Sequence, residues 1–106
     1  MPNKIDFTHL HVHPQYSLLD GLCKDEDLAA AAKNYGMDAL AITDHGAMYG
    51  AIHFYNTMRA NGIKPIIGME AYYTAGNRSD KSREFKTNHL LLLAKNLTGY
   101  HNLLKL

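Results

Sequence analysis

Hydrophobic and polar positions follow two different periods along the chain, and the changes between them mark the expected elements. In residues 5–13 (IDFTHLHVH), Phe7 and the histidines fall on one parity and Leu10 and Val12 on the other, which predicts a strand. Three acidic residues at 25–27 then precede an alanine-rich run that Gly36 ends. This pattern predicts a helix of about three turns, because acids favour the helix N-terminus and glycine its end.

The same reasoning places elements along the rest of the chain. Three more apolar runs have the length of strands, and two stretches with apolar residues three to four apart predict helices. The runs are residues 38–43, 64–73 and 89–94, and the helical stretches are residues 48–61 and 96–106. Thr98 is the expected N-cap of the last helix. Residues 74–88 are polar and predict a long loop.

Strands that alternate with helices in this order are typical of a parallel α/β protein, either a barrel or an open doubly wound sheet. Four parallel strands make half a barrel, so the sequence predicts the first half of a larger domain. Strand edges exposed at such a boundary favour a dimer of the fragment.

Composition narrows the classes of protein to consider. The chain has 106 residues, a net charge of +1 and 46% hydrophobic residues, and no apolar run approaches the length of a membrane span. A nearly neutral chain can contact nucleic acid only through a local site. The single Cys23 excludes an intrachain disulfide, and the N-terminus lacks the apolar stretch of a secretory signal. We therefore expect a cytoplasmic protein without a membrane segment.

Seven histidines are the unusual feature of this composition. Strand periodicity puts His9, His11 and His13 on one face, with successive residues about 6.6 Å apart, so that two imidazoles can share an ion. His9 lies deeper in the predicted strand, where core packing or support of its neighbours is expected. His53 and His101 fall within predicted helices, which favours surface or packing roles.

Other metal-competent side chains lie near the ends of the predicted strands, where ligands gather in α/β folds. They are Asp20, Asp44, His45, Glu70 and His89. Asp44 is expected either to bind metal or to support catalysis by orienting a neighbouring imidazole. Asp25 and its acidic neighbours are expected to be helix-terminus charges only.

A set of histidines and carboxylates without cysteine suits Zn, Mn or Fe. Two or three adjacent divalent ions lower the pKa of bound water and clamp phosphate oxygens, so the expected chemistry is phosphoester hydrolysis. Four cations in the long loop either meet a phosphate backbone or form a solvated charge run. They are Arg78, Lys81, Arg83 and Lys86. Of Tyr72 and Tyr73, one is expected in the core and the other exposed, where it can stack on a base.

Four motifs together resemble a known family: HLHVHPQYSLLDGL, ALAITDHGAMYGAIHFY, GIKPIIGMEAYY and HLLLLAKNLTGYHNLLKL. The chain is similar to the start of the PHP (polymerase and histidinol phosphatase) domain, in the branch at the N-terminus of bacterial replicative DNA polymerase III alpha subunits. The resemblance covers nearly the whole chain apart from residues 74–88. It implies that residues 1–106 form the N-terminal half of a PHP-type distorted (β/α)7 barrel with parallel strands.

The resemblance also implies a metal centre with up to three divalent ions in the complete domain. The implied ligands are His11, His13, Asp20, His45, Glu70 and His89. The family's remaining ligands lie beyond Leu106, so this fragment is expected to show little or no nuclease activity.

The function implied by the resemblance is that of a DNA-directed DNA polymerase. In the intact protein, the PHP domain would act as a metal-dependent 3′–5′ proofreading exonuclease on a single-stranded DNA 3′ end. The rest of the polymerase and the replisome subunits would be its partners. Two alternatives stay open, a non-catalytic structural module of the polymerase and a free-standing PHP phosphatase.

Overall fold

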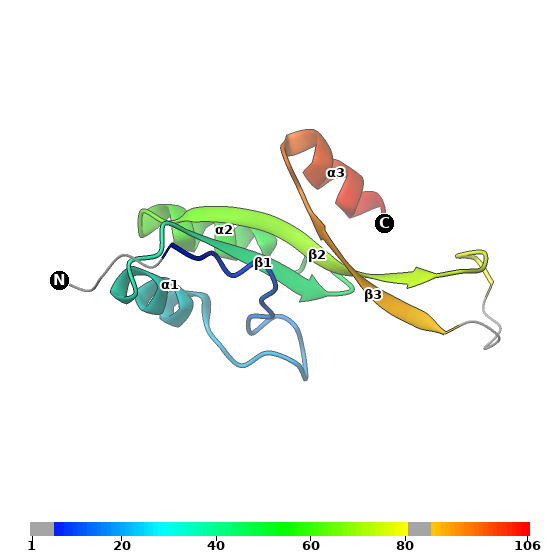
Figure 1. The fold of residues 1–106 in the computed structure, drawn as a ribbon, viewed down its shortest axis with the longest axis horizontal. Coiled ribbons are helices and arrows are strands. Elements are labelled where there is room, and N and C mark those ends of the chain that lie inside the picture. Colours follow the sequence, from blue (N-terminus) through cyan, green and yellow to red (C-terminus); the bar gives the residue numbers. More distant parts are fainter. Residues whose placement is uncertain (1–5, 81–85) are drawn as a thin grey trace.

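The computed structural model describes residues 6–80 and 86–106, which form a three-stranded sheet with three helices (Figure 1). In chain order the elements are α1 (Asp25–Asn34), β1 (Ala39–His45), α2 (Ala51–Ala60), β2 (Lys64–Thr74), β3 (Thr87–Leu93) and α3 (Leu97–Lys105). The strand order is β1-β2-β3. In this part of the chain, no helix is long and apolar enough to cross a membrane.

The sheet is mixed, which corrects the prediction of parallel strands throughout. β1 and β2 are parallel, with His45 opposite Glu70, whereas β2 and β3 are antiparallel, with Tyr72 opposite His89. A parallel pair needs a crossover connection, usually a helix. The described residues between β2 and β3 include no helix, so the chain reverses its direction there. The structure therefore shows a small α/β unit, and four parallel strands are absent from the residues described.

The segment predicted as the first strand, residues 5–13, does not form a regular strand in its described part. Its described residues run beside the outer edge of β1, where the Ala41 N–H donates to the His9 carbonyl and the Thr43 N–H donates to the Val12 carbonyl, at 3.1 and 2.9 Å. His9 and Val12 are three residues apart but their partners only two apart, so one extra residue bulges out and the regular ladder is broken. His9 is exposed, with its ring 4.8 Å from that of Phe7, which corrects the expectation that it packs in the core.

The hydrophobic core lies between α1, α2 and β1. Its buried members are Ala29, Ala32, Leu40, Ile42, Phe54, Met58 and Ile63. In α2, Phe54 and Met58 lie on the buried face, whereas Ile52 and Tyr55, which are also at apolar spacing in the sequence, are exposed. The small alanines of α1 allow that helix to approach closely. Burial of this apolar surface is what holds both helices against the sheet.

The N-cap of the last helix lies two residues before the predicted one. Its N-cap is Asn96, whose Oδ1 accepts a hydrogen bond from the Gly99 N–H at 3.0 Å. Asn96 is in an extended conformation and satisfies one of the free amides of the first turn. Thr98, the predicted cap, already lies inside α3.

Both tyrosines at the end of β2 are exposed, so the prediction that one packs in the core is wrong. β1 ends at His45, opposite Glu70, and β2 runs on with only β3 beside it. Figure 1 shows this two-stranded arm beyond the end of β1. Of the four loop cations, Arg78 and Lys86 are described and exposed, whereas Lys81 and Arg83 lie outside the described residues.

One buried carboxylate joins α1 to α2. Asp25 is fully buried and its Oδ2 lies 2.5 Å from Nδ1 of His53, which corrects the prediction that Asp25 is only a helix-terminus charge. Burial raises the pKa of Asp25, and the hydrogen bond with Asp25 raises the pKa of His53. The ring of Tyr16 packs edge-on against His53 at 5.9 Å. The pair therefore fixes α1 against α2 through two residues that lie 28 positions apart in the sequence.

This contact predicts a pH-dependent contribution to stability. Because its pKa is raised in the folded chain, His53 stabilises the fold below its ordinary pKa of 6.5, and this stabilisation is lost as the pH rises through the raised pKa. His53→Gln is therefore expected to cost about 1 kcal/mol near pH 6 and less near pH 9, a modest effect because His53 is 44% exposed.

Urea unfolding of both chains from pH 5.5 to 9 measures this difference. His101→Gln is the control, since His101 is an exposed histidine on α3 whose described contact is the ring of Tyr100. A cost for His53→Gln that stays constant across this range would contradict the prediction.

Candidate metal centre

The candidate ligands come from four segments that meet at the C-terminal end of β1. His11, His13 and Asp20 lie in the segment before α1, His45 ends β1, Glu70 lies in β2 and His89 is in β3. The sheet register places His45 opposite Glu70, and it places His89 opposite Tyr72, two residues further along β2. Because alternate residues of a strand share a face, His89 and Glu70 point to the same side of the sheet.

All six candidate ligands lie in one cluster. Their donor atoms form three groups, within each of which the atoms lie no more than 4.8 Å apart. The groups are His11, His13 and Glu70; His13, Asp20 and His45; and His45, Glu70 and His89. Because three of the residues belong to two groups each, the groups adjoin one another. Such an arrangement is suited to neighbouring ions rather than to one isolated ion.

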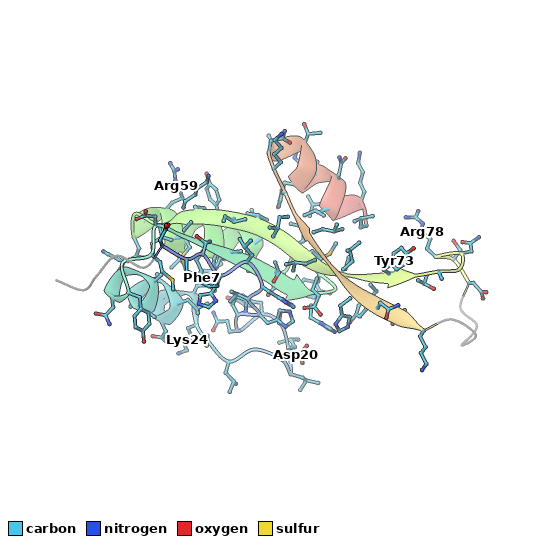
Figure 2. The ribbon with its side chains drawn as sticks, in the orientation of Figure 1. Phe7, Asp20, Lys24, Arg59, Tyr73 and Arg78 are labelled. Atoms are coloured by element: carbon cyan, nitrogen blue, oxygen red, sulfur yellow. The ribbon has the colours of Figure 1, made fainter. Side chains whose placement is uncertain are left out.

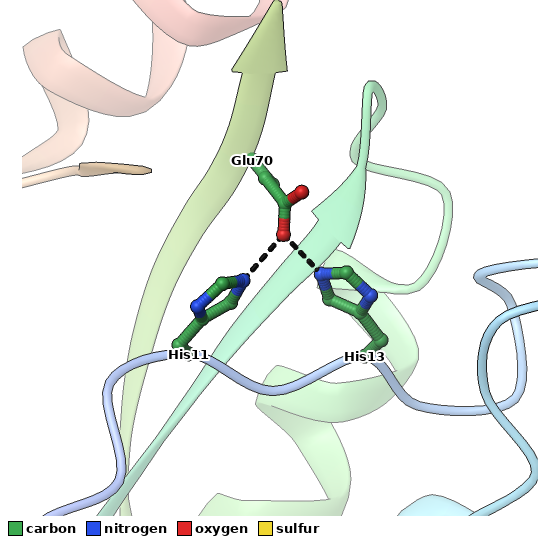
Figure 3. Close-up of side chains that lie close together, drawn as sticks. All are labelled: His11, His13 and Glu70. Atoms are coloured by element: carbon green, nitrogen blue, oxygen red, sulfur yellow. Dashed lines mark hydrogen bonds and ion pairs between the residues drawn. The ribbon is translucent and has the colours of Figure 1, made fainter. Parts of the chain in front are cut away.

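Glu70 is the centre of the cluster. Its side chain is only 3% exposed, and Figure 3 shows the rings of His11 and His13 converging on one carboxylate oxygen. That oxygen, Oε2, contacts Nε2 of His11 and lies 2.5 Å from Nε2 of His13. The other oxygen, Oε1, lies 2.6 Å from Nδ1 of His89 and 3.3 Å from Nδ1 of His45. One buried carboxylate thus meets four imidazoles.

These neighbours keep the Glu70 carboxylate ionised. Burial alone would raise its pKa, but the hydrogen bonds and positive charge of His11 and His13 outweigh burial and lower the pKa to about 2. At neutral pH, Glu70 is therefore in the deprotonated form that a metal ligand requires.

His45 supplies the observation that tests whether a cation fits. Its Nδ1 is buried and has no hydrogen-bond partner among the described residues, although Glu70 Oε1 lies 3.3 Å away and Asp20 Oδ2 3.6 Å away. A buried nitrogen left without a partner is costly, and a cation between it and two carboxylates would remove that cost. The donors are nitrogen and oxygen atoms only, which fits Zn, Mn or Fe. The residues present therefore fit a divalent metal site.

Asp20 is the accessible carboxylate of the cluster, whereas the Glu70 carboxylate is buried. A tight turn carries it, in which the Ser17 N–H donates to the Pro14 carbonyl and the Asp20 N–H donates to the Ser17 carbonyl, both at 3.0 Å. Figure 2 shows Asp20 on this loop, below the C-terminal end of β1. Its side chain is 46% exposed, so Asp20 lies at the rim of the cluster, where a bound molecule can reach it.

Asp44 supports His45 through hydrogen bonds that lie outside the donor groups. It is buried, and its carboxylate accepts hydrogen bonds from the Ser17 hydroxyl at 2.8 Å and from the Gly50 N–H at 2.9 Å. The Ser17 Oγ in turn accepts from the His45 N–H at 3.1 Å. The contacts described for Asp44 are therefore with Ser17 and Gly50 and not with an imidazole, so it acts on His45 through Ser17.

Sequence reasoning missed both partners of Asp44. A Cβ at Gly50 would lie 2.9 Å from Asp44 Oδ2, so the glycine allows the carboxylate to approach the backbone. Ser17 and Gly50 carry no metal-competent group, and their role depends on contacts that form only in the folded chain. The sequence contains no local signal for them.

Comparison with known proteins identifies the family. The family model described as "PHP domain" matches residues 9–106. The chain belongs to the PHP family. The resemblance inferred from the four motifs is thereby confirmed.

Curated relatives agree with this family. The chain is 47% identical to the DNA polymerase III subunit alpha of Aquifex aeolicus, with 95% of the chain and 9% of that protein aligned. It is 52% identical to the subunit of Campylobacter jejuni over 94% of the chain and 8% of that protein. For Thermus aquaticus the identity is 48%, over 100% of the chain and 9% of that protein. This PHP chain thus spans less than a tenth of the length of these relatives.

Proposed function

We propose that this chain is the N-terminal portion of the PHP domain of a bacterial replicative DNA polymerase alpha subunit. About half of its residues are identical to the N-terminal regions of relatives that carry the name DNA polymerase III subunit alpha. The proposal makes the parent a cytoplasmic DNA-directed DNA polymerase with DNA and replisome subunits as partners. A free-standing phosphatase is the weaker explanation, because these relatives are named as polymerase subunits.

We further propose that the cluster around Glu70 binds divalent metal ions. The ligands would be His11, His13, Asp20, His45, Glu70 and His89. The observation that carries this proposal is a buried carboxylate surrounded by four imidazoles, beside a buried His45 nitrogen without a hydrogen-bond partner in the described residues. The buried Glu70 carboxylate and the buried His45 nitrogen would be stabilised by a cation between them.

The chemistry that suits this site is hydrolysis of a phosphodiester. When bound, divalent ions lower the pKa of water and stabilise charge on phosphate oxygens. Glu70 and His13, each shared by two groups, would hold neighbouring ions, and the accessible Asp20 would face the substrate at the rim. We propose that the substrate in the intact protein is a single-stranded DNA 3′ end and that the reaction is 3′–5′ proofreading.

A structural role is the second candidate, and a specific observation favours it. The six side chains come from four separate segments, and metal bound between them would hold these segments together. Many large apolar side chains of this chain are exposed, Leu90 in β3 and Leu97 in α3 among them. Burial of apolar surface therefore contributes less to the stability of these two elements. Metal binding would then serve the fold of the polymerase rather than catalysis.

Asp20→Asn in the full-length polymerase separates these two roles. Asp20 is accessible and belongs to only one of the three groups, so the substitution should change reactivity more than stability. We expect at least a tenfold slower release of nucleotides from a 3′-labelled single strand with Mn²⁺, with the melting temperature measured without added metal unchanged. Unchanged nuclease activity with a lowered melting temperature would support the structural role.

A further inference from the structure

We propose that Tyr72 is a positioning residue that fixes the imidazole rings of His45 and His89 in the orientation that metal binding requires. The inference rests on the proposed metal-binding function and adds a residue outside the donor set. Tyr72 lies in β2, two residues after Glu70, and is paired with His89 in the sheet register. It therefore stands beside the group formed by His45, Glu70 and His89.

The contacts of Tyr72 are with both of these imidazoles. Its ring centroid lies 5.1 Å from that of His45, at an interplanar angle of 87°, and 5.6 Å from that of His89, at 66°. The two imidazoles lie 4.9 Å apart at 86°. Each of the three rings thus packs edge to face against the other two. Edge-to-face contacts are directional, so each ring restricts the rotation of its neighbours.

This restriction matters because a metal-binding imidazole needs something that fixes the orientation of its ring. A metal-binding histidine normally donates its second ring N–H to a carboxylate or a backbone carbonyl, which sets the tautomer and the orientation of the ring. Within residues 6–80 and 86–106, Nδ1 of both rings faces Glu70, and the ion pairs described for both rings involve Nδ1 and not Nε2. Tyr72 packs against both rings and restricts their rotation.

The backbone holds Tyr72 in turn. Gly46 has a positive φ of 66°, and a Cβ at this position would lie 2.6 Å from Cε2 of Tyr72. The Gly46 N–H donates to the Glu70 carbonyl at 2.9 Å, which ties this turn to β2. The tyrosine ring thus packs on the backbone of Gly46, which has no side chain and is hydrogen-bonded to the strand of Glu70. Its place is set by the fold and not by the imidazoles alone.

The adjacent residue provides a matched control. Tyr73 follows in the same strand, so its side chain points to the opposite face of the sheet. The two tyrosines are almost equally exposed, 53% for Tyr72 and 55% for Tyr73, and the described ring contacts involve only Tyr72. Figure 2 shows Tyr73 on the arm beyond the end of β1.

Titration of the chain with Zn²⁺ against a chromophoric chelator tests the inference. We expect Tyr72→Ala to weaken Zn²⁺ binding about tenfold, as loss of residues that orient ligands does in other metal sites. The Zn²⁺ affinity of Tyr72→Phe and of Tyr73→Ala should stay within about twofold of that of the original chain. The first substitution keeps the aromatic ring, and the second changes a residue that does not contact the imidazoles. Tyr72→Leu keeps an apolar side chain over Gly46 without a ring, and we expect it to bind as weakly as Tyr72→Ala.

A second comparison shows whether Tyr72 acts through His45 and His89. In a His11→Ala background, Tyr72→Ala should still weaken binding about tenfold, because its imidazole partners are intact. In a His89→Ala background the effect should be at least threefold smaller, since one partner ring is gone. An equal effect in both backgrounds would overturn the inference, because it would show a general loss of structure.

The outcomes distinguish this inference from the function on which it rests. If the original chain binds Zn²⁺ and Tyr72→Ala binds it equally well, the positioning role of Tyr72 is wrong and the metal site stands. If the original chain binds no Zn²⁺, the proposed metal-binding function fails and the role of Tyr72 fails with it.

Discussion

Glu70→Gln is expected to weaken Zn²⁺ binding more than a hundredfold, the largest effect of any single substitution in the cluster. Removing a residue that only supports ligands costs about 10- to 100-fold, and removal of a shared anionic ligand should cost more. Glu70 belongs to two of the three donor groups, and its lowered pKa of about 2 keeps it charged at neutral pH. Glutamine keeps the size of the side chain but removes the charge, so a large loss would come from the electrostatics and not from repacking.

Calorimetric titration with Zn²⁺ and with Mn²⁺ measures this loss directly. A second measurement is the rise in melting temperature on adding metal, which reports only binding to the folded chain. We expect that rise to disappear in Glu70→Gln and to be reduced in Asp20→Asn, which affects one group. Asp27→Asn, an exposed residue of α1, serves as the control for the loss of one negative charge and should behave as the original chain. Unweakened binding by Glu70→Gln would show that metal binds elsewhere.

The helices and the strands β1 and β2 could be predicted because their signals are local. The apolar spacing of α2, the alanines of α1 and the continuous apolar run of β1 each reflect burial against one surface. The parallel direction predicted for β3 was wrong, because an apolar run such as HLLLL carries no sign of whether its neighbour is parallel. Direction depends on the connection, and the predicted loop without a helix was the available sign of a reversal.

The gathering of the candidate ligands could also be predicted, for a different reason. Histidines and carboxylates at strand ends are few in number, and the fold brings strand ends together. The supporting contacts could not be predicted. Ser17 meets Asp44, 27 residues away, and His53 meets Asp25, 28 residues away, through pairings that only the folded chain creates. Tyr72 was expected as a core or base-stacking residue, because period-2 alternation does not show that β1 stops before it.

Asp44→Ala is expected to cause the largest loss of stability among the site residues, about 3 kcal/mol. Its buried carboxylate accepts from the Ser17 hydroxyl and from the Gly50 N–H, and alanine would leave both donors unsatisfied. Each buried donor left without an acceptor costs roughly 1 to 3 kcal/mol. Asp44→Asn keeps one acceptor oxygen but turns an N–H₂ group toward the other donor, so we expect about half of this loss.

Urea unfolding in the presence of a chelator measures the loss of stability separately from metal binding. Asp27→Ala, on the exposed face of α1, is the matched control and should change the free energy of unfolding by less than about 0.5 kcal/mol. The same contacts predict a second consequence. Ser17 Oγ accepts from the His45 N–H, so freeing Ser17 should also move His45 and weaken Zn²⁺ binding. If Asp44→Ala proved as stable as Asp27→Ala, the chain of contacts from Gly50 through Asp44 and Ser17 to His45 would not support the site.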